Sequence, residues 1–170
     1  MAKHSVARYN KEIIEKVHTF YHDVLKIDFS SDNLNYYIQS LTLTSYAKEY
    51  NDISKTKIND NRGLATLGDA VLDACISKLA FLANPYISRG KVTDCKKHYG
   101  RNENLNRIGK EYLKLNNYLL KKSSDNTLKK AHATAVESII GCIFLNKGFD
   151  QAFAFVNEYI IMNTETFDFN

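Results

Sequence analysis

Apolar residues recur every three or four positions along most of the chain, a spacing that places them on one face of an α-helix. The polar stretches 51–61 and 121–127 are expected to be loops, and the basic stretch 88–100 predicts a short helix at most. The last eight residues are expected to fray. The helical spacing covers residues 6–27, 34–50, 64–82, 102–113, 128–145 and 149–162, with a further short helix near 116–120.

Helix-breaking residues are scarce in this sequence. It contains one Pro and seven Gly, whereas an all-β fold needs frequent turns. We therefore predict an all-α helical bundle built around one hydrophobic core. The expected organisation is an N-terminal extension of the first helix (residues 1–15), the helical domain (16–162) and a C-terminal tail (163–170).

Composition narrows the possible function classes only slightly. Hydrophobic residues make up 44% of the 170 residues, which argues against disorder, and the net charge of +4 permits a polyanionic partner. The three cysteines are widely spaced and form no CxxC pair, so neither a disulfide framework nor a zinc site is expected. No signal peptide is visible, and the apolar run 139–145 is too short to span a bilayer. We expect a cytoplasmic protein with no membrane partner.

Two aspartates share one face of the helix predicted over 64–82. Asp69 and Asp73 are four residues apart among apolar neighbours, so two like charges lie close together beside the core. A bound cation would relieve their repulsion. In the alternative interpretation one aspartate is solvated and the other pairs with a Lys or Arg. The spacing alone leaves both interpretations open.

A single glutamate lies in the middle of the apolar helix predicted over 128–145. Glu137 is the only acidic residue between Asp125 and Asp150. Gly141, one turn later, allows another helix to approach closely. Because an unpaired buried charge is costly, this carboxylate either binds a cation or pairs with a nearby base such as His132.

Four stretches of the chain resemble motifs of the ribonuclease III family, and they occur in the family's order. Residues 68–72 (GDAVL) resemble the core of its signature, and residues 137–141 (ESIIG) resemble its second acidic motif. Residues 40–49 (SLTLTSYAKE) and 101–108 (RNENLNRI) are similar to two further motifs. The resemblance covers residues 16–159. It implies a helical endonuclease domain that forms a homodimer, here without a double-stranded-RNA-binding domain.

Three acids of the usual family pattern are replaced in this chain. Arg62 and Ala65 stand seven and four residues before Asp69, and Thr134 stands three before Glu137. The segments AxxGDAVLD and HATxxE resemble instead the motifs AxxGDAVYE and KATxxEA of the compact Mini-ribonuclease III subgroup, whose members cut structured ribosomal RNA precursors. The departures are open to two interpretations: a variant of that branch, or a domain that has lost catalysis.

The resemblance implies a catalytic set of Asp69, Glu137 and Asp73. Asp69 and Glu137 would bind Mg²⁺, with Mn²⁺ as an alternative, while Asp73 acts through a hydrogen bond or a bound water and Thr134 holds a metal-bound water. Mg²⁺ keeps several waters as ligands, so two carboxylates are chemically sufficient. The implied function is metal-dependent cleavage of double-stranded or structured RNA, for example in ribosomal RNA maturation. The alternative is a catalytically inactive RNA-binding or ribosome-associated module.

Basic residues near these motifs are candidates for RNA contact, because double-stranded RNA is recognised mainly through its backbone and 2′-hydroxyls. An ordinary solvated surface is the alternative interpretation of the same residues. The candidates are Arg89, Lys91, Lys96, Lys97, Arg101, Lys129 and Lys130, with His98, Lys121 and Lys122 beside them.

Overall fold

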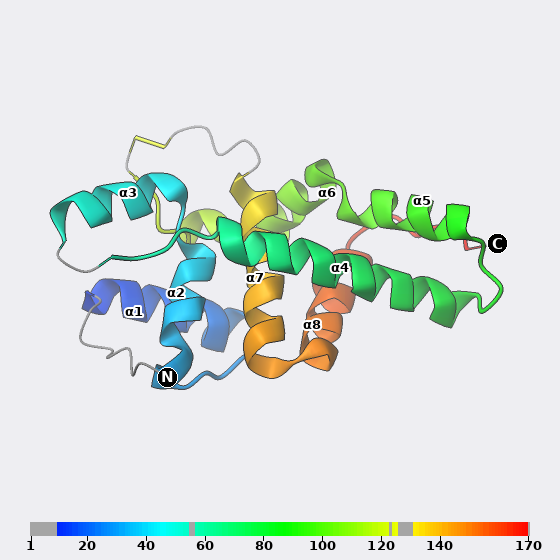
Figure 1. Cartoon of the computed structure of the whole chain (residues 1–170), viewed down its shortest axis with the longest axis horizontal. Helices are drawn as coiled ribbons and strands as arrows, with labels where there is room; N and C mark the ends of the chain where they lie inside the picture. Colours follow the sequence, from blue (N-terminus) through cyan, green and yellow to red (C-terminus); the bar gives the residue numbers. More distant parts are fainter. Residues whose placement is uncertain (1–9, 55–56, 123, 126–130, 170) are drawn as a thin grey trace.

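Helices account for most of the computed structural model, which describes residues 10–54, 57–122, 124–125 and 131–169. No strand occurs in these ranges, which confirms the all-α prediction. Figure 1 shows the long helix α4 along the molecule, α5 running back beside it, and α7 crossing it. The α-helices are α1 (Lys11–His18), α2 (Leu34–Leu41), α3 (Thr44–Ile53), α4 (Arg62–Ala83), α5 (Arg89–Gly100), α6 (Asn102–Arg107), α7 (Ala131–Lys147) and α8 (Phe149–Phe155).

Several shorter helical segments extend or connect these helices. The helices α1, α6 and α8 each continue directly into a π-helical turn, so each covers most of the longer helix predicted there. The π-helical turns are Thr19–Val24, Ile108–Tyr112 and Val156–Ile161, and the 3₁₀ turns are Ser31–Asn33 and Leu115–Asn117.

Two glycines let α4 and α7 cross at backbone contact. A methyl group on Gly68 would lie 1.7 Å from the carbonyl oxygen of Glu137, and one on Gly141 would lie 2.3 Å from the carbonyl oxygen of Leu64. No side chain fits at either position without moving a helix. The crossing therefore fixes α4 and α7 at the level of Gly68 and Glu137.

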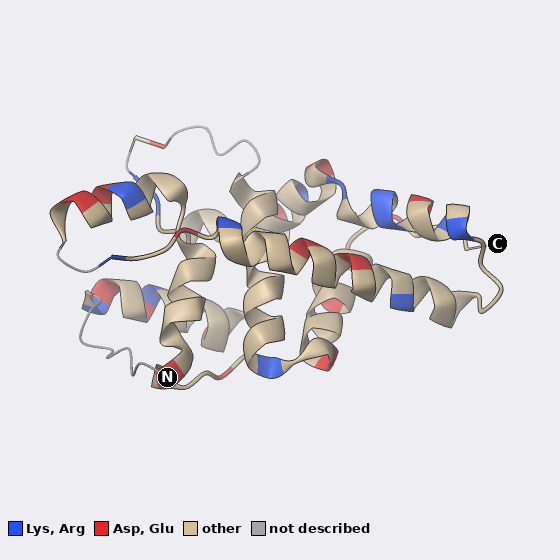
Figure 2. Ribbon diagram, in the orientation of Figure 1, with Lys and Arg blue, Asp and Glu red and all other residues tan. Residues whose placement is uncertain are grey.

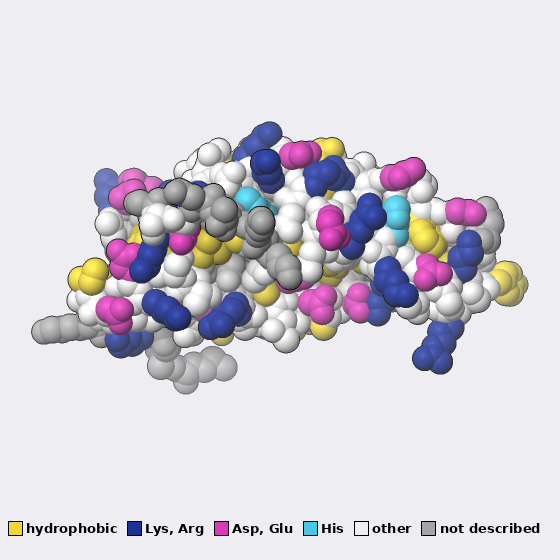
Figure 3. Space-filling view, turned by 90° about the horizontal axis from the view of Figure 1, so that it is seen from above, with side chains coloured by type: hydrophobic (Ala, Val, Ile, Leu, Met, Phe, Trp, Pro, Cys, Tyr) yellow, Lys and Arg dark blue, Asp and Glu magenta, His cyan; other side chains and the backbone are white. Residues whose placement is uncertain are grey.

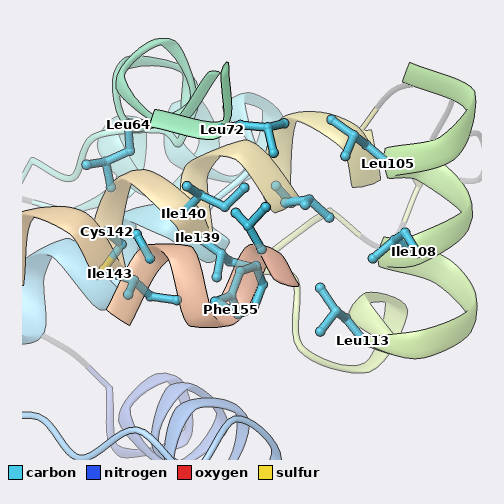
Figure 4. Packing of buried hydrophobic residues seen from close by; sticks show 14 of the residues in the cluster. Leu64, Leu72, Leu105, Ile108, Leu113, Ile139, Ile140, Cys142, Ile143 and Phe155 are labelled. Atoms are coloured by element: carbon cyan, nitrogen blue, oxygen red, sulfur yellow. The ribbon is translucent and has the colours of Figure 1, made fainter. Parts of the chain in front are cut away.

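The hydrophobic core surrounds this crossing. Figure 4 shows side chains from α4, α7, α8 and the 105–113 segment converging on it. Ile139 and Ile140 on α7 are fully buried, as is Leu105 on α6. Burial of several large apolar side chains, each worth about 1.5–3 kcal/mol, holds α7 in the centre of the bundle.

The helix predicted over 34–50 is wrong as a single element, because the chain leaves the helical conformation at Thr42 and Leu43. The Leu43 amide donates to the carbonyl oxygen of Leu120 (2.9 Å), and the Asn61 amide donates to that of Thr42 (2.9 Å). These long-range backbone bonds replace local helical ones. The interruption brings the start of α4 and the 120 segment to the same place.

The basic stretch forms a longer helix than predicted. Arg89–Gly100 is one α-helix of 12 residues, and the Ser88 side chain caps it by accepting a hydrogen bond from the Lys91 amide. Cys95 and Tyr99 are buried on its inner side. These two buried residues, at helical spacing, anchor the helix to the core, although the charged residues around them obscured the apolar pattern in the sequence.

The C-terminal tail packs against α5, so the expectation that it frays is wrong. The Phe167 amide donates to the Tyr99 hydroxyl (3.1 Å), and the Asn84 side-chain amide donates to the carbonyl oxygen of Phe169 (3.0 Å). Both phenylalanine rings lie against the core. The tail therefore supports the helical hairpin formed by α4 and α5, which projects from the bundle in Figure 1.

Cys75, Cys95 and Cys142 are buried free thiols. Among the described helices, none is long and apolar enough to cross a membrane.

The glycine crossing generates a stability prediction. Gly68→Ala or Gly141→Ala should lower the free energy of unfolding by about 3 kcal/mol or more, because each methyl group would overlap a backbone carbonyl. Urea denaturation followed by circular dichroism measures the change. Gly63→Ala is the matched control, since its nearest neighbour would be 4.0 Å away, and it should gain roughly 0.5–1 kcal/mol of helix propensity. Equal stability of the Gly68→Ala and Gly63→Ala proteins would contradict the crossing.

Candidate active site

An open groove lies where α5 and α7 meet the exposed side of α4. Its lining from α7 is Thr134 and Glu137, three residues apart on one face. From α4 it takes a single helical stripe: Arg62, Ala65, Thr66, Asp69 and Asp73. All three acids that the sequence singled out therefore line one groove, together with Thr134.

The carboxylates of Asp69 and Glu137 face the same space from different helices. Asp69 is exposed, whereas Glu137 is partly buried. Burial, and then the negative charge of Asp69, raise the pKa of Glu137 from 4.5 to about 7. Bringing a second anion next to a partly desolvated carboxylate costs free energy unless a cation joins them. A cation bound between these two carboxylates would therefore stabilise their charged forms.

The proposed pairing of Glu137 with His132 is wrong. The His132 ring lies within hydrogen-bond distance of the Asn116 side-chain oxygen (Nε2 to Oδ1, 3.0 Å). Burial and the charges of Lys121 and Lys110 lower the pKa of His132, so its ring favours the neutral form. A neutral imidazole bonded to Asn116 provides no counter-charge for Glu137.

Asp73 has a different environment from the other two acids. Its carboxylate forms an ion pair with the ammonium of Lys96 on α5. This pair, together with the exposed position of Asp69, matches the alternative interpretation, in which one aspartate is solvated and the other pairs with a Lys. Within the described ranges, no group of three or more His, Cys, Asp or Glu side chains is arranged to hold a metal ion. A metal site here would therefore depend on two carboxylates.

The predicted RNA-contact residues separate into two sets. Lys96, Lys97 and Arg101 line the groove, whereas Arg89 and Lys91 lie on α5 outside it. Lys129 and Lys130 fall outside the described residues. Figure 2 shows basic positions along α5 beside the acidic positions of α4. The cations that line the groove with the acids therefore come from the second half of α5 and from Arg101 directly after it.

Several cations near the groove already have partners. Lys91 pairs with the Asp168 carboxylate (3.9 Å), and Lys97 pairs with that of Asp94 (3.9 Å). His98 faces the tail, with its ring 2.6 Å from the backbone carbonyl oxygen of Glu165. Because exposed pairs of this kind contribute little, Lys97 can exchange its carboxylate for a phosphate at small cost.

One basic residue of the groove was not predicted to contact RNA. Arg62 lies one turn before Thr66 on the α4 stripe, and its Nε donates to the Asp60 carboxylate (2.8 Å). Its position seven residues before Asp69 places it on the same helix face, a signal that was present in the sequence. It adds a cation to the end of the groove opposite α5.

Charges on the surface are interspersed. In the view of Figure 3, basic and acidic side chains alternate over the face, and Lys and Arg do not form one continuous patch. The groove itself takes Arg62 from the start of α4 and Arg101 from the residue that follows α5.

Comparison with known proteins places the chain in a family. A family model described as Ribonuclease-III-like matches residues 33–164. Ribonuclease 3 of Mycoplasma genitalium is 29% identical over 91% of this chain, and that of Borreliella burgdorferi is 33% identical over 78%. The chain spans 56% and 53% of the lengths of these two proteins.

Solved structures agree with the sequence comparison. The nuclease domain of ribonuclease III from Campylobacter jejuni superposes with a TM-score of 0.69 at 25% identity, covering 88% of this chain and 97% of that domain. Giardia Dicer superposes with the same TM-score at 19% identity, covering 94% of this chain and 21% of the Dicer chain, and shows a shared fold. The predicted ribonuclease III-type helical fold is confirmed, and the chain belongs to the ribonuclease-III-like family.

Proposed function

We propose that the chain is a metal-dependent endoribonuclease that cuts double-stranded or structured RNA in the α4–α7 groove. The observation that carries this proposal is the approach of Asp69 and Glu137 from two helices, which leaves two carboxylates in one groove and raises the pKa of Glu137. Family membership and the names of the ribonuclease relatives support the same activity.

The residues present fit a hard divalent cation. Carboxylate oxygens are the ligands that Mg²⁺ and Mn²⁺ prefer, and a cation would offset the repulsion between Asp69 and Glu137. These two side chains would bind the cation directly. The Thr134 hydroxyl would form a hydrogen bond with a water molecule in the same groove. When bound, such an ion activates water for attack on a phosphodiester and stabilises the leaving oxygen.

The basic residues of the groove would hold the RNA backbone. Arg62 on one side of the acids and Lys97 and Arg101 on the other can each neutralise a phosphate. Double-stranded RNA presents phosphates and 2′-hydroxyls across a wide, shallow minor groove, which suits contacts from separated cations. The protein's cations would therefore position the backbone while the two carboxylates serve the cleaved bond.

A homodimer would bring two such grooves to opposite strands of one duplex. The nuclease domain of Campylobacter jejuni ribonuclease III has structural flexibility in a region involved in dimer formation, and this relative supports a dimer here. Ribosomal RNA maturation in the cytoplasm remains the biological role that the sequence resemblance suggests.

The competing candidate is a catalytically silent module that binds RNA. It accounts for Arg62 and Ala65 in places where the family has acids. A silent module, however, has no need for two carboxylates in one groove, where burial and Asp69 disfavour the charged form of Glu137. We therefore favour the enzyme. Incubation of the purified protein with double-stranded RNA and Mg²⁺, with EDTA in a parallel reaction, distinguishes the two.

Removing either carboxylate charge should abolish cleavage. Asp69→Asn and Glu137→Gln should each lower the single-turnover rate by about 10³-fold, an effect of the size seen when one charge-stabilising group is removed from an active site. Affinity for uncut RNA should be largely retained. Glu111→Gln, an exposed acid outside the groove, is the control and should cleave normally. Normal cleavage by the Glu137→Gln protein would overturn the assignment.

The raised pKa of Glu137 predicts a pH-dependent stability of the metal-free protein. Between pH 4.5 and 7 the folded protein retains a proton that the unfolded chain has released, so the free energy of unfolding falls as pH rises. Glu137→Gln should therefore stabilise the protein by roughly 1–3 kcal/mol at pH 8, after allowance for solvent screening, and have little effect at pH 4.5. Urea denaturation in EDTA tests this, and an equal gain at both pH values would count against it.

RNA affinity should depend on salt. Arg101→Gln should reduce the slope of log affinity against log salt concentration by about one, because one phosphate contact is lost. Binding is measured by fluorescence anisotropy with a labelled RNA duplex and the Glu137→Gln background, which prevents cleavage. Lys147→Gln, on the exposed end of α7, should leave the slope unchanged. An affinity that does not vary with salt would exclude these contacts.

A further inference from the structure

The ion pair between Asp73 and Lys96 places a positive charge inside the groove. Lys96 projects from α5 on the face that also carries Thr93 and Gly100, at spacings of three and four residues, and all three line the groove. Asp73 projects from α4, one helical turn beyond Asp69. The pair therefore joins the two helices beside the proposed metal ligands.

Both members of the pair remain open to the groove. The side-chain exposures are 34% for Lys96 and 43% for Asp73, so neither group is sealed in the protein. A lysine ammonium has three donors, and Asp73 is the acceptor that Lys96 contacts in the described part of the chain. Two donors are therefore left for an incoming oxygen.

The ion pair between Lys96 and Asp73 contributes little to the free energy of folding. Ion pairs this exposed contribute about 0–1 kcal/mol, because holding a long side chain in one position offsets the Coulomb attraction. What the pair does is place a flexible ammonium. Residues four apart on a helix have Cβ atoms about 5–6 Å apart, so Lys96 is held about one helical turn from the carboxylate of Asp69.

The ion pair also affects the charge balance among the acids of the groove. Asp73 is paired with Lys96, which leaves Asp69 and Glu137 as the acids of the groove without an ion pair in the described part of the chain. Two carboxylates balance the charge of one divalent cation, whereas a second such ion would lack carboxylate ligands. The Lys96 ammonium, which Asp73 holds through one contact, has donors left for a phosphate oxygen that a single divalent cation would leave without a partner.

We propose that Lys96 is a catalytic residue that contacts a non-bridging oxygen of the phosphodiester being cut, and that Asp73 is the positioning residue that holds Lys96 there. This inference rests on the proposed function of the groove. It assigns Asp73 a role different from binding metal or metal-bound water, and it makes Lys96 distinct from the cations that only hold RNA.

A double-mutant cycle tests the coupling of the two residues. Lys96→Met and Asp73→Asn should each lower the single-turnover cleavage rate at saturating RNA by roughly 10²-fold, and the double variant should be no slower than Lys96→Met. Lys96→Arg should recover part of the rate, and Lys147→Met should cleave normally. Additive losses in the double variant would overturn the assignment of Asp73, because it would then act independently of Lys96.

Metal binding gives a second readout that does not depend on activity. Mn²⁺ titration of the RNA-free protein, followed by electron paramagnetic resonance, should show tighter binding by Lys96→Met than by the wild type, because a positive charge beside the carboxylates is removed. Cleavage by the same variant should be slower. A merely structural role would weaken both, and weaker Mn²⁺ binding with a normal urea midpoint would overturn the proposal.

RNA binding separates this inference from the proposed function itself. In Ca²⁺, or in the Glu137→Gln background, Lys96→Met should reduce the salt slope by about one. If the wild-type protein binds duplex RNA but cuts none, the proposed function fails and the reduced slope still supports contact between Lys96 and phosphate. If the wild type cleaves and the Lys96→Met protein cleaves at the same rate, the proposed function stands and the role of Lys96 is overturned.

Discussion

Backbone contact between α4 and α7 determines where each acid of the groove lies. Gly68 and Gly141 allow the two helices to cross at a separation that excludes any side chain. Asp69 immediately follows one glycine, and Glu137 lies one turn before the other, so the crossing brings their carboxylates into one groove. Core packing around Ile139 and Ile140 holds this arrangement in place. The same contact thus stabilises the fold and creates the electrostatic repulsion that a bound cation would relieve.

Three helices supply the charged side chains of the groove. The helix α4 supplies Asp69 and Asp73, α7 supplies Glu137, and α5 supplies cations. The position of α5 depends on the C-terminal tail, which packs against it through Phe167. The tail therefore supports the helix that carries Lys96 and Lys97, although the tail itself is not part of the groove lining. Asp73 and Lys96 join α4 to α5 within this groove.

Sequence patterns within one helix predicted the features that depend on residues close together in the sequence. Helical spacing identified the centres of α4 and α7, and the motifs around Asp69 and Glu137 identified the family. Features that depend on distant contacts were not accessible. The break at Thr42 requires Leu120, and the Asp73 pair requires a hairpin that brings Lys96 back along α4. Nearness in sequence suggested His132 as a partner for Glu137, but its ring is bonded to Asn116.

The central claim is that Asp69 and Glu137 together bind one divalent cation. The most direct measurement is anomalous X-ray scattering from crystals of the protein soaked with Mn²⁺. We expect a peak within direct ligand distance of carboxylate oxygens of both residues, about 2.0–2.3 Å, while Asp73 remains paired with Lys96. A peak that has Asp73 as its ligand, or Mn²⁺ bound away from Glu137, would contradict the account.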